Sequence, residues 1–248
     1  MSELATPAAA DVRILIATPV YGSAKSASVA VAYHMAVTSL VRDSHFGILP
    51  AVYGCDVIRA RSRVVRQFLE ETSATHLLWW DADTAVDAAQ AGRLVARLVD
   101  SGEAFVGCTY PKKRVHWGRG PGEESAYDYP ISLAKDGAVD EHACCSVEGL
   151  PLGFALCTRS MLQAMARHYG DELGFVDVLE GRSIPTVALF QLARVPDTRE
   201  GLLLGEDYSF SHRWRAMGGR CALYVGEDCE LGHVGSHVFQ GHREGYCR

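Results

Sequence analysis

Residues 76–83 read HLLWWDAD, a short apolar run that ends abruptly in two acids, Asp81 and Asp83. A continuous apolar run of this length is typical of a strand that is buried on both faces of a sheet. Two carboxylates directly after a buried strand are expected to have a partner or a ligand, because burying unpaired charge is costly. The stretch therefore predicts a strand of a central sheet and a polar site where that strand ends.

Segments of alternating type surround this strand in the first 110 residues. The β-branched runs and the helical spacing of apolar residues predict strands at 12–17, 48–53 and 104–108, and helices at 28–41, 57–71 and 87–101. This alternation implies an α/β fold with a mostly parallel central sheet and helices on both faces. Ligands of such sheets bind at the carboxyl ends of the strands, where Asp81 and Asp83 are expected.

The sequence changes character after residue 110. Residues 111–150 are rich in Gly, Pro and charge, which predicts a long irregular loop with a hairpin near 131–139. The elements expected beyond it are a strand at 155–157, helices at 160–169 and 206–217, and a strand at 222–225. We interpret residues 1–11 as a disordered lead-in and residues 12–248 as a single domain.

Composition excludes some classes of function. The net charge of −6 argues against a general nucleic-acid binder, which needs a basic surface, although 112–114 (KKR) is a local basic stretch. The sequence contains no window of about 18 apolar residues, so no membrane span is expected. The acidic, Ala-rich N-terminus does not resemble a signal peptide. The eight cysteines form no C-x-x-C pair, which favours reduced thiols in a cytoplasmic protein.

Three groups of residues carry candidate chemistry. Asp81 and Asp83 offer oxygens to Mg²⁺ or Mn²⁺, which commonly share a site with substrate phosphates. Glu206 and Asp207 open a predicted helix, where they either interact with its dipole or deprotonate a substrate hydroxyl. His233 lies in a Gly-rich segment, LGHVGSH at 231–237. The glycines disfavour a helical zinc-binding His pair and favour a single imidazole that completes the metal site.

The motifs together resemble the GT-A-type glycosyltransferases, most closely the small bacterial and phage-like members of the family-two group. The resemblance runs from about Ile14 to Phe239. Ser62 stands where the family has Asn. The matching segments are ILIATPVY (14–21), RARS (59–62), LLWWDADT (77–84), YPKKRVHW (110–117), GF (153–154), GEDYSF (205–210) and HVG (233–235).

The resemblance implies a role for each chemical group. Asp83 would chelate Mn²⁺ or Mg²⁺ directly, Asp81 would contact the ribose or the metal, and His233 would be the third protein ligand. Asp207 would be the general base, with Glu206 as the second candidate. The residues expected to bind the nucleotide-sugar donor are Thr18, Pro19, Tyr21 and Arg61 at the nucleoside, Lys112 or Lys113 at the diphosphate, and Trp117 against a sugar face.

The reaction implied is transfer of a sugar from a nucleotide-diphosphate sugar to an acceptor hydroxyl. UDP-sugar is favoured as donor over GDP-sugar, inversion is favoured over retention, and the acceptor stays open. Residues 12–110 would form the nucleotide-binding half and 111–248 the acceptor-binding half. For Trp117, a buried structural role is equally consistent with the sequence.

Three alternative functions are also consistent with the sequence. The first is a catalytically inactive domain of the same fold that only binds a nucleotide or glycan. The second is a nucleotidyltransferase, which commonly has a Gly-rich phosphate loop with a basic residue after its first strand. Here only Lys25 is in range. The third is a zinc protein built from C-terminal residues, namely Cys229, His233, His237, His242 and Cys247.

Overall fold

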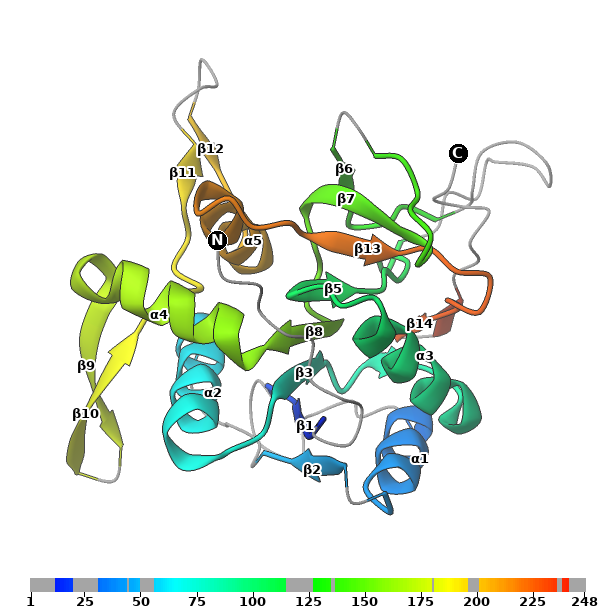
Figure 1. Cartoon of the computed structure of the whole chain (residues 1–248), viewed down its shortest axis with the longest axis horizontal. Coiled ribbons are helices and arrows are strands. Elements are labelled where there is room, and N and C mark those ends of the chain that lie inside the picture. Colours follow the sequence, from blue (N-terminus) through cyan, green and yellow to red (C-terminus); the bar gives the residue numbers. More distant parts are fainter. Residues whose placement is uncertain are drawn as a thin grey trace.

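A central sheet of eight strands, ordered β2-β1-β3-β8-β5-β13-β7-β6, organises the molecule (Figure 1). The computed structural model describes residues 12–19, 31–43, 45–49, 56–114, 127–134, 137–179, 181–195, 201–235 and 238–240. The strands of this sheet are β1 (Ile14–Ala17), β2 (Phe46–Ile48), β3 (His76–Trp80), β5 (Phe105–Gly107), β6 (Ser132–Leu133), β7 (Cys144–Gly149), β8 (Phe154–Thr158) and β13 (Ala222–Tyr224).

The strand directions agree with a mostly parallel sheet. Strand β1 is parallel to both β2 and β3, and β13 is parallel to β5. Strand β8 is antiparallel to its neighbours β3 and β5, and β7 is antiparallel to β13 and β6. Strands β2, β1, β3, β5, β13 and β6 therefore share one direction, and only β8 and β7 oppose it. The predicted α/β class is confirmed.

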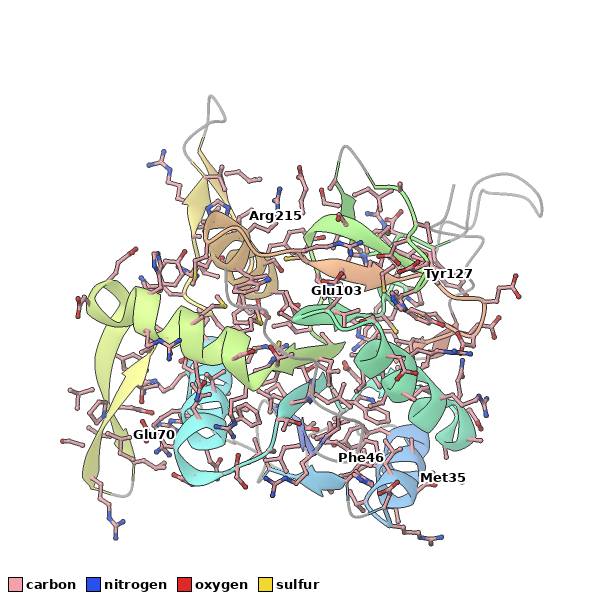
Figure 2. The ribbon with its side chains drawn as sticks, in the orientation of Figure 1. Met35, Phe46, Glu70, Glu103, Tyr127 and Arg215 are labelled. Atoms are coloured by element: carbon pink, nitrogen blue, oxygen red, sulfur yellow. The ribbon has the colours of Figure 1, made fainter. Side chains whose placement is uncertain are left out.

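Helices cover both faces of this sheet (Figure 1). Helices α1 (Val31–Leu40) and α3 (Ala88–Asp100) lie on one face, and α2 (Val57–Glu71), α4 (Arg159–Leu173) and α5 (Glu206–Ala216) lie on the other. Figure 2 shows Met35 of α1 and Glu70 of α2 on opposite sides of the molecule. Among the described helices, none has both the length and the apolar character needed to cross a membrane.

Alternation along β3 divides the core into two clusters. Leu77 and Trp79 pack under α2, α4 and α5, whereas Leu78 and Trp80 pack under α1 and α3. All four side chains are 0% exposed, and each contributes about 1.5–3 kcal/mol of hydrophobic free energy on full burial. The continuous apolar run at 76–80 is thus the pattern of a strand with helices on both faces.

Local capping sets the ends of the helices near the site. The Asp56 side chain accepts from the N–H of Arg59 at the start of α2, and the Asp87 side chain accepts from the N–H of Ala89 at the start of α3. These bonds satisfy amides that have no partner within the helix. Helix α5 ends before Gly218, whose φ of 85° lies in the left-handed region that glycine tolerates.

Several elements differ from the sequence-based expectation. Strand β2 lies at 46–48 rather than 48–53, because Phe46 pairs with Ile14 of β1; residues 50–55 lie outside the described part of the chain. The hairpin expected near 131–139 uses β6 and the longer β7, which we did not predict. Helix α4 continues to Leu173, beyond the expected end at 169. The six cysteines in the described part of the chain are buried.

Three smaller sheets were not predicted. Strands β9 (Gly174–Leu179) and β10 (Arg182–Val187) form a hairpin beside α2 and α4, and β11 (Arg194–Val195) pairs with β12 (Leu202–Leu203). The exposed residues of these hairpins give no alternating burial signal. The third sheet joins β4 (Thr84–Ala85), β14 (Gly232–Val234) and β15 (Val238–Gln240). It brings the C-terminal part of the chain to the end of β3.

Candidate functional site

The turn after β3 is held by backbone hydrogen bonds on both sides. The N–H of Asp81 donates to the carbonyl of Gly153 at 3.0 Å, and the carbonyl of Asp81 accepts from the N–H of Thr84 at 2.9 Å. The carbonyl of Asp83 accepts from the N–H of Val234 at 2.8 Å. These bonds fix the direction in which the two carboxylates leave the sheet.

Arg61 of α2 lies beneath this turn, where it compensates two acids. Its side chain is 3% exposed, and its Nη2 lies 3.5 Å from Asp81 Oδ1 and 3.6 Å from Asp207 Oδ1. The guanidinium carbon is 5.2 Å from the ring centroid of Trp79. We call Arg61, Asp81 and Asp207 the inner cluster. A buried guanidinium suits this place because it stays charged and is weakly hydrated.

The environment of Asp207 makes its carboxylate a candidate base. Asp207 lies in the first turn of α5, and its Oδ2 accepts from the N–H of Leu152 at 3.2 Å. Burial raises its pKa, and Glu206 and Asp81 raise it further. Arg61 and the Leu152 N–H act in the opposite direction, and the result is a pKa of about 7. A base with a pKa near the working pH is effective in proton transfer.

Asp81 has the same kind of environment as Asp207. Burial raises the pKa of Asp81, as does the neighbouring charge of Asp83, and these effects outweigh the attraction of Arg61. The inner cluster thus holds more negative charge than its single arginine compensates. Two atoms of Arg61, Nε and Nη1, are buried and have no hydrogen-bond partner in the described structure. Such unsatisfied donors are uncommon in folded proteins.

Asp83 belongs to a second group nearer the surface, which we call the outer cluster: Asp83, Lys113 and His233. The Oδ2 atom of Asp83 lies 2.5 Å from Lys113 Nζ and 3.5 Å from His233 Nε2. Burial acts to raise the pKa of Asp83, but the hydrogen bonds from His233 and Lys113 outweigh it and lower the pKa to about 2. Asp83 is therefore a carboxylate at any physiological pH.

The orientation of His233 is set by its strand and by Pro111. Strand β14 pairs with β4 so that His233 lies opposite Thr84, next to the acidic turn. The Nδ1 atom of His233 lies 2.9 Å from the carbonyl oxygen of Pro111. Because a carbonyl only accepts, Nδ1 carries the proton of this hydrogen bond, and Nε2 is the ring nitrogen that faces Asp83. Metal-binding histidines are commonly oriented in this way.

The donor set of the outer cluster fits a divalent cation. A carboxylate oxygen and an imidazole nitrogen face each other, and both are suitable ligands of Mn²⁺. Asp81 lies two residues from Asp83, but its Oδ1 faces Arg61. Among the described residues, no group of three His, Cys, Asp or Glu side chains is already arranged to hold a metal ion. Asp83 and His233 thus bring together two donor atoms of the kind that a divalent cation accepts, two residues from Asp81.

The remaining predicted residues take several positions. Thr18 and Pro19 follow β1, which is parallel to β3, and the Thr18 hydroxyl lies 2.5 Å from the Tyr33 hydroxyl. Lys112 is exposed, and its N–H donates to the carbonyl of Asp128. Glu206 lies in the first turn of α5, beside Asp207. Tyr21, Trp117, His237, His242 and Cys247 lie outside the described residues.

Tyr110 and Gly153 are residues of the site whose positions the sequence did not reveal. Tyr110 is 7% exposed, its hydroxyl accepts from the N–H of Gly153 at 3.2 Å, and its ring contacts the His233 ring edge-on at 4.9 Å between centroids. A side chain at Gly153 would collide with the Tyr110 ring. Gly153 lies in one of the segments that resemble the family, but its contact with Tyr110 joins residues that are 43 positions apart.

Ser62, where the family resemblance calls for Asn, has a local role. It is 1% exposed, and its hydroxyl donates to the carbonyl of Ile58, one turn earlier in α2. A Ser hydroxyl often satisfies itself in this way within a helix.

No protein-family model and no curated protein sequence matches the chain. Among solved structures, A197 from STIV aligns over 90% of this chain and 86% of its own length, with 19% identity and a TM-score of 0.47. GalNAc-T7, in a crystal structure with UDP, GalNAc and Mn²⁺, aligns over 90% of this chain and 43% of its own length, with 11% identity and a TM-score of 0.48. The chain thus spans less than half of that second protein.

Proposed function

We propose that the chain is a metal-dependent glycosyltransferase that moves a sugar from a nucleotide-diphosphate sugar, with UDP-sugar favoured, to an acceptor hydroxyl. The observation that carries the proposal is the meeting of the inner and outer clusters at the carboxyl end of β3. There, Asp81 interacts electrostatically with Asp83 and His233 of the outer cluster and also with Asp207, whose pKa is about 7. A cation site next to a base is the arrangement that this transfer needs.

The outer cluster would hold the metal. Asp83 and His233 are the proposed ligands of Mn²⁺ or Mg²⁺, with Asp81 adjoining. When bound, such a cation neutralises charge on a departing nucleotide diphosphate. Pro111 supports this role because its carbonyl keeps the Nε2 of His233 directed at Asp83. Lys113 and Lys112 are the proposed side chains for the phosphate oxygens, since both follow the buried Tyr110 and are exposed.

Asp207 would act as the general base. With a pKa of about 7, it can accept the proton of an acceptor hydroxyl and keeps enough basicity to assist attack on the sugar carbon. A base on the acceptor side supports direct displacement, and hence inversion. Glu206 is the second candidate because it lies in the same helical turn.

The nucleoside would bind near the end of β1, with Thr18, Pro19 and Tyr21 as the proposed contacts in the nucleotide-binding half at 12–110. Arg61 is 2% exposed, so we propose that it acts on the nucleotide site through Asp81 rather than by touching the base itself. Residues 111–248 contribute Asp207 and His233 and would form the acceptor-binding half.

Thermal unfolding in the presence of UDP, GDP, CDP, TDP or ADP, each with and without Mn²⁺, tests the proposal. A ligand at a hundredfold excess over its Kd stabilises the native state by about 2.7 kcal/mol, which corresponds to a rise in Tm of roughly 5–10 °C for a chain of this size. We expect such a rise for one nucleotide, only with Mn²⁺. Asp83→Asn should abolish it, while Asp171→Asn on the exposed surface of α4 should keep it.

Assays of UDP-sugar turnover then separate the alternatives. Binding with hydrolysis or transfer of the sugar agrees with a glycosyltransferase. Binding without any turnover would favour the inactive binding domain of the same fold. Absence of a shift for every nucleotide would contradict the proposal and lead to glycan binding as the next hypothesis.

A further inference from the structure

Lys113 occupies the oxygen that a metal would need. Its Nζ lies 2.5 Å from Asp83 Oδ2, and the same oxygen faces His233 Nε2 at 3.5 Å. An ammonium and a divalent cation cannot both lie against this one oxygen, because like charges at such a separation repel strongly. Metal binding between Asp83 Oδ2 and His233 Nε2 therefore requires Lys113 to leave that oxygen.

The Lys113–Asp83 pair is of a kind that exchanges readily. The side chain of Lys113 is 38% exposed and that of Asp83 is 32% exposed. Exposed ion pairs contribute little to stability because water competes for both partners. The inner cluster differs in this respect, since the side chain of Arg61 is only 3% exposed. Of Arg61 and Lys113, Lys113 is thus the cation that can move.

The backbone before Lys113 is anchored, which limits the movement to its side chain. Tyr110 is buried and bonded to Gly153, and the carbonyl of Pro111 holds the ring of His233. The N–H of Lys112 donates to the carbonyl of Asp128 at 2.7 Å. A lysine carries a compact charge on a flexible four-carbon stem. It can therefore swing by a few ångströms without any change in the fold.

We propose that Lys113 is an exchangeable counter-ion that neutralises Asp83 in the metal-free protein and transfers to the donor diphosphate when a divalent cation binds. The inference rests on the proposed function. Lys113 competes with the metal while no diphosphate is present, and it shares the diphosphate charge with the metal once the donor has bound. The result is ordered binding in which metal and nucleotide assist each other.

Removal of the Lys113 charge should therefore change two affinities in opposite directions. Lys113→Met should bind Mn²⁺ alone about three- to tenfold more tightly, because a competing cation is gone. The same variant should bind UDP about three- to tenfold more weakly at saturating Mn²⁺, because a phosphate partner is gone. A purely structural role of Lys113 would weaken both.

The experiment measures Mn²⁺ binding to the protein without nucleotide, by electron paramagnetic resonance of free Mn²⁺, and then UDP binding by calorimetry at saturating Mn²⁺. Lys113→Gln serves as a second variant in case the methionine disturbs folding. Arg114→Met is the matched control, because it removes the same charge from the next exposed residue. It should change each affinity by less than about twofold, since solvent screens distant charges.

The outcomes distinguish the inference from the function on which it rests. Opposite changes in the two affinities support the exchange. A wild-type protein that binds Mn²⁺ and UDP, with Lys113 variants that bind Mn²⁺ no more tightly than wild type does, would overturn the exchange alone. A wild-type protein that binds neither Mn²⁺ nor UDP would overturn both.

Discussion

The inner and outer clusters contain carboxylates two residues apart in opposite electrostatic states. The side chains of Asp81 and Asp83 are similarly accessible, at 27% and 32%. Burial nevertheless raises the pKa of Asp81, whereas hydrogen bonds from His233 and Lys113 overcome burial and lower that of Asp83 to about 2. Overall exposure of a side chain therefore does not determine the state of these acids; the partners of each one do.

The two clusters are suited to different tasks. The inner cluster compensates its acids with one buried guanidinium, which cannot lose its proton and has little room to move. The outer cluster uses an exposed ammonium and an imidazole, which a ligand can displace or recruit. We infer that the inner cluster positions the base and the turn, and that the outer cluster exchanges cations. Substitutions and pH changes that act on one cluster at a time test this division.

The largest effect is expected on turnover. Asp207→Asn removes the proposed base and should lower kcat by about 10²–10⁴-fold. In the wild type, kcat should rise with pH through about 7, because the base must lose its proton. The neighbouring groups that shift the pKa of Asp207 are Arg61, Glu206, Asp81 and the Leu152 N–H. Initial rates between pH 5.5 and 8.5 measure both effects. If Glu206→Gln abolishes turnover and Asp207→Asn does not, Glu206 is the base.

The next effect concerns stability. Arg61→Met leaves Asp81 and Asp207 without their buried counter-charge, and should lower the free energy of unfolding by about 3–5 kcal/mol. Urea unfolding at pH 7 measures it. Arg59→Met, two residues earlier on the same helix, removes an exposed arginine that is 4.0 Å from Asp56, and should cost less than about 1 kcal/mol. Equal losses in the two variants would show that the buried Arg61 stabilises the fold no more than an exposed arginine does.

The smallest effect is expected on the free energy of unfolding, which Asp207 and Asp83 should change in opposite directions as pH changes. Between pH 4 and 7 the folded Asp207 keeps a proton that the unfolded chain releases, so this residue lowers stability as pH rises to about 7. Asp83 does the reverse: it stabilises the fold above its ordinary pKa of 3.8, and this contribution is lost as pH falls through about 2.

At pH 8 we therefore expect Asp207→Asn to raise Tm by about 2–4 °C and Asp83→Asn to lower it by a similar amount. Thermal unfolding of both variants in metal-free buffer measures this. The Asn side chain keeps an oxygen for the Leu152 N–H, so the first substitution removes charge and leaves the hydrogen bond. A decrease in Tm for both variants would contradict the assignment of opposite environments.

Several features of the fold were predictable because their causes are local. Helix α2 was expected at 57–71 and occupies Val57–Glu71, since its apolar spacing and its cap at Asp56 lie within the same segment. Strand β3 was expected at 76–80 and occupies those residues because its apolar run is continuous. The hairpin of β9 and β10 was not expected, since Val176 and Val178 are 64% exposed and give no burial pattern.

For the candidate site, residue types and their order along the chain were enough to identify the candidate residues: two acids after a buried strand, two acids at the start of a helix, and one histidine between glycines. How these residues are paired became clear from the folded structure. Arg61 meets Asp207 across 146 positions of the sequence, and Lys113 meets Asp83 across 30. Residue types and short-range spacing are properties of the chain, whereas the partner and burial of each charge depend on how distant segments pack around β3.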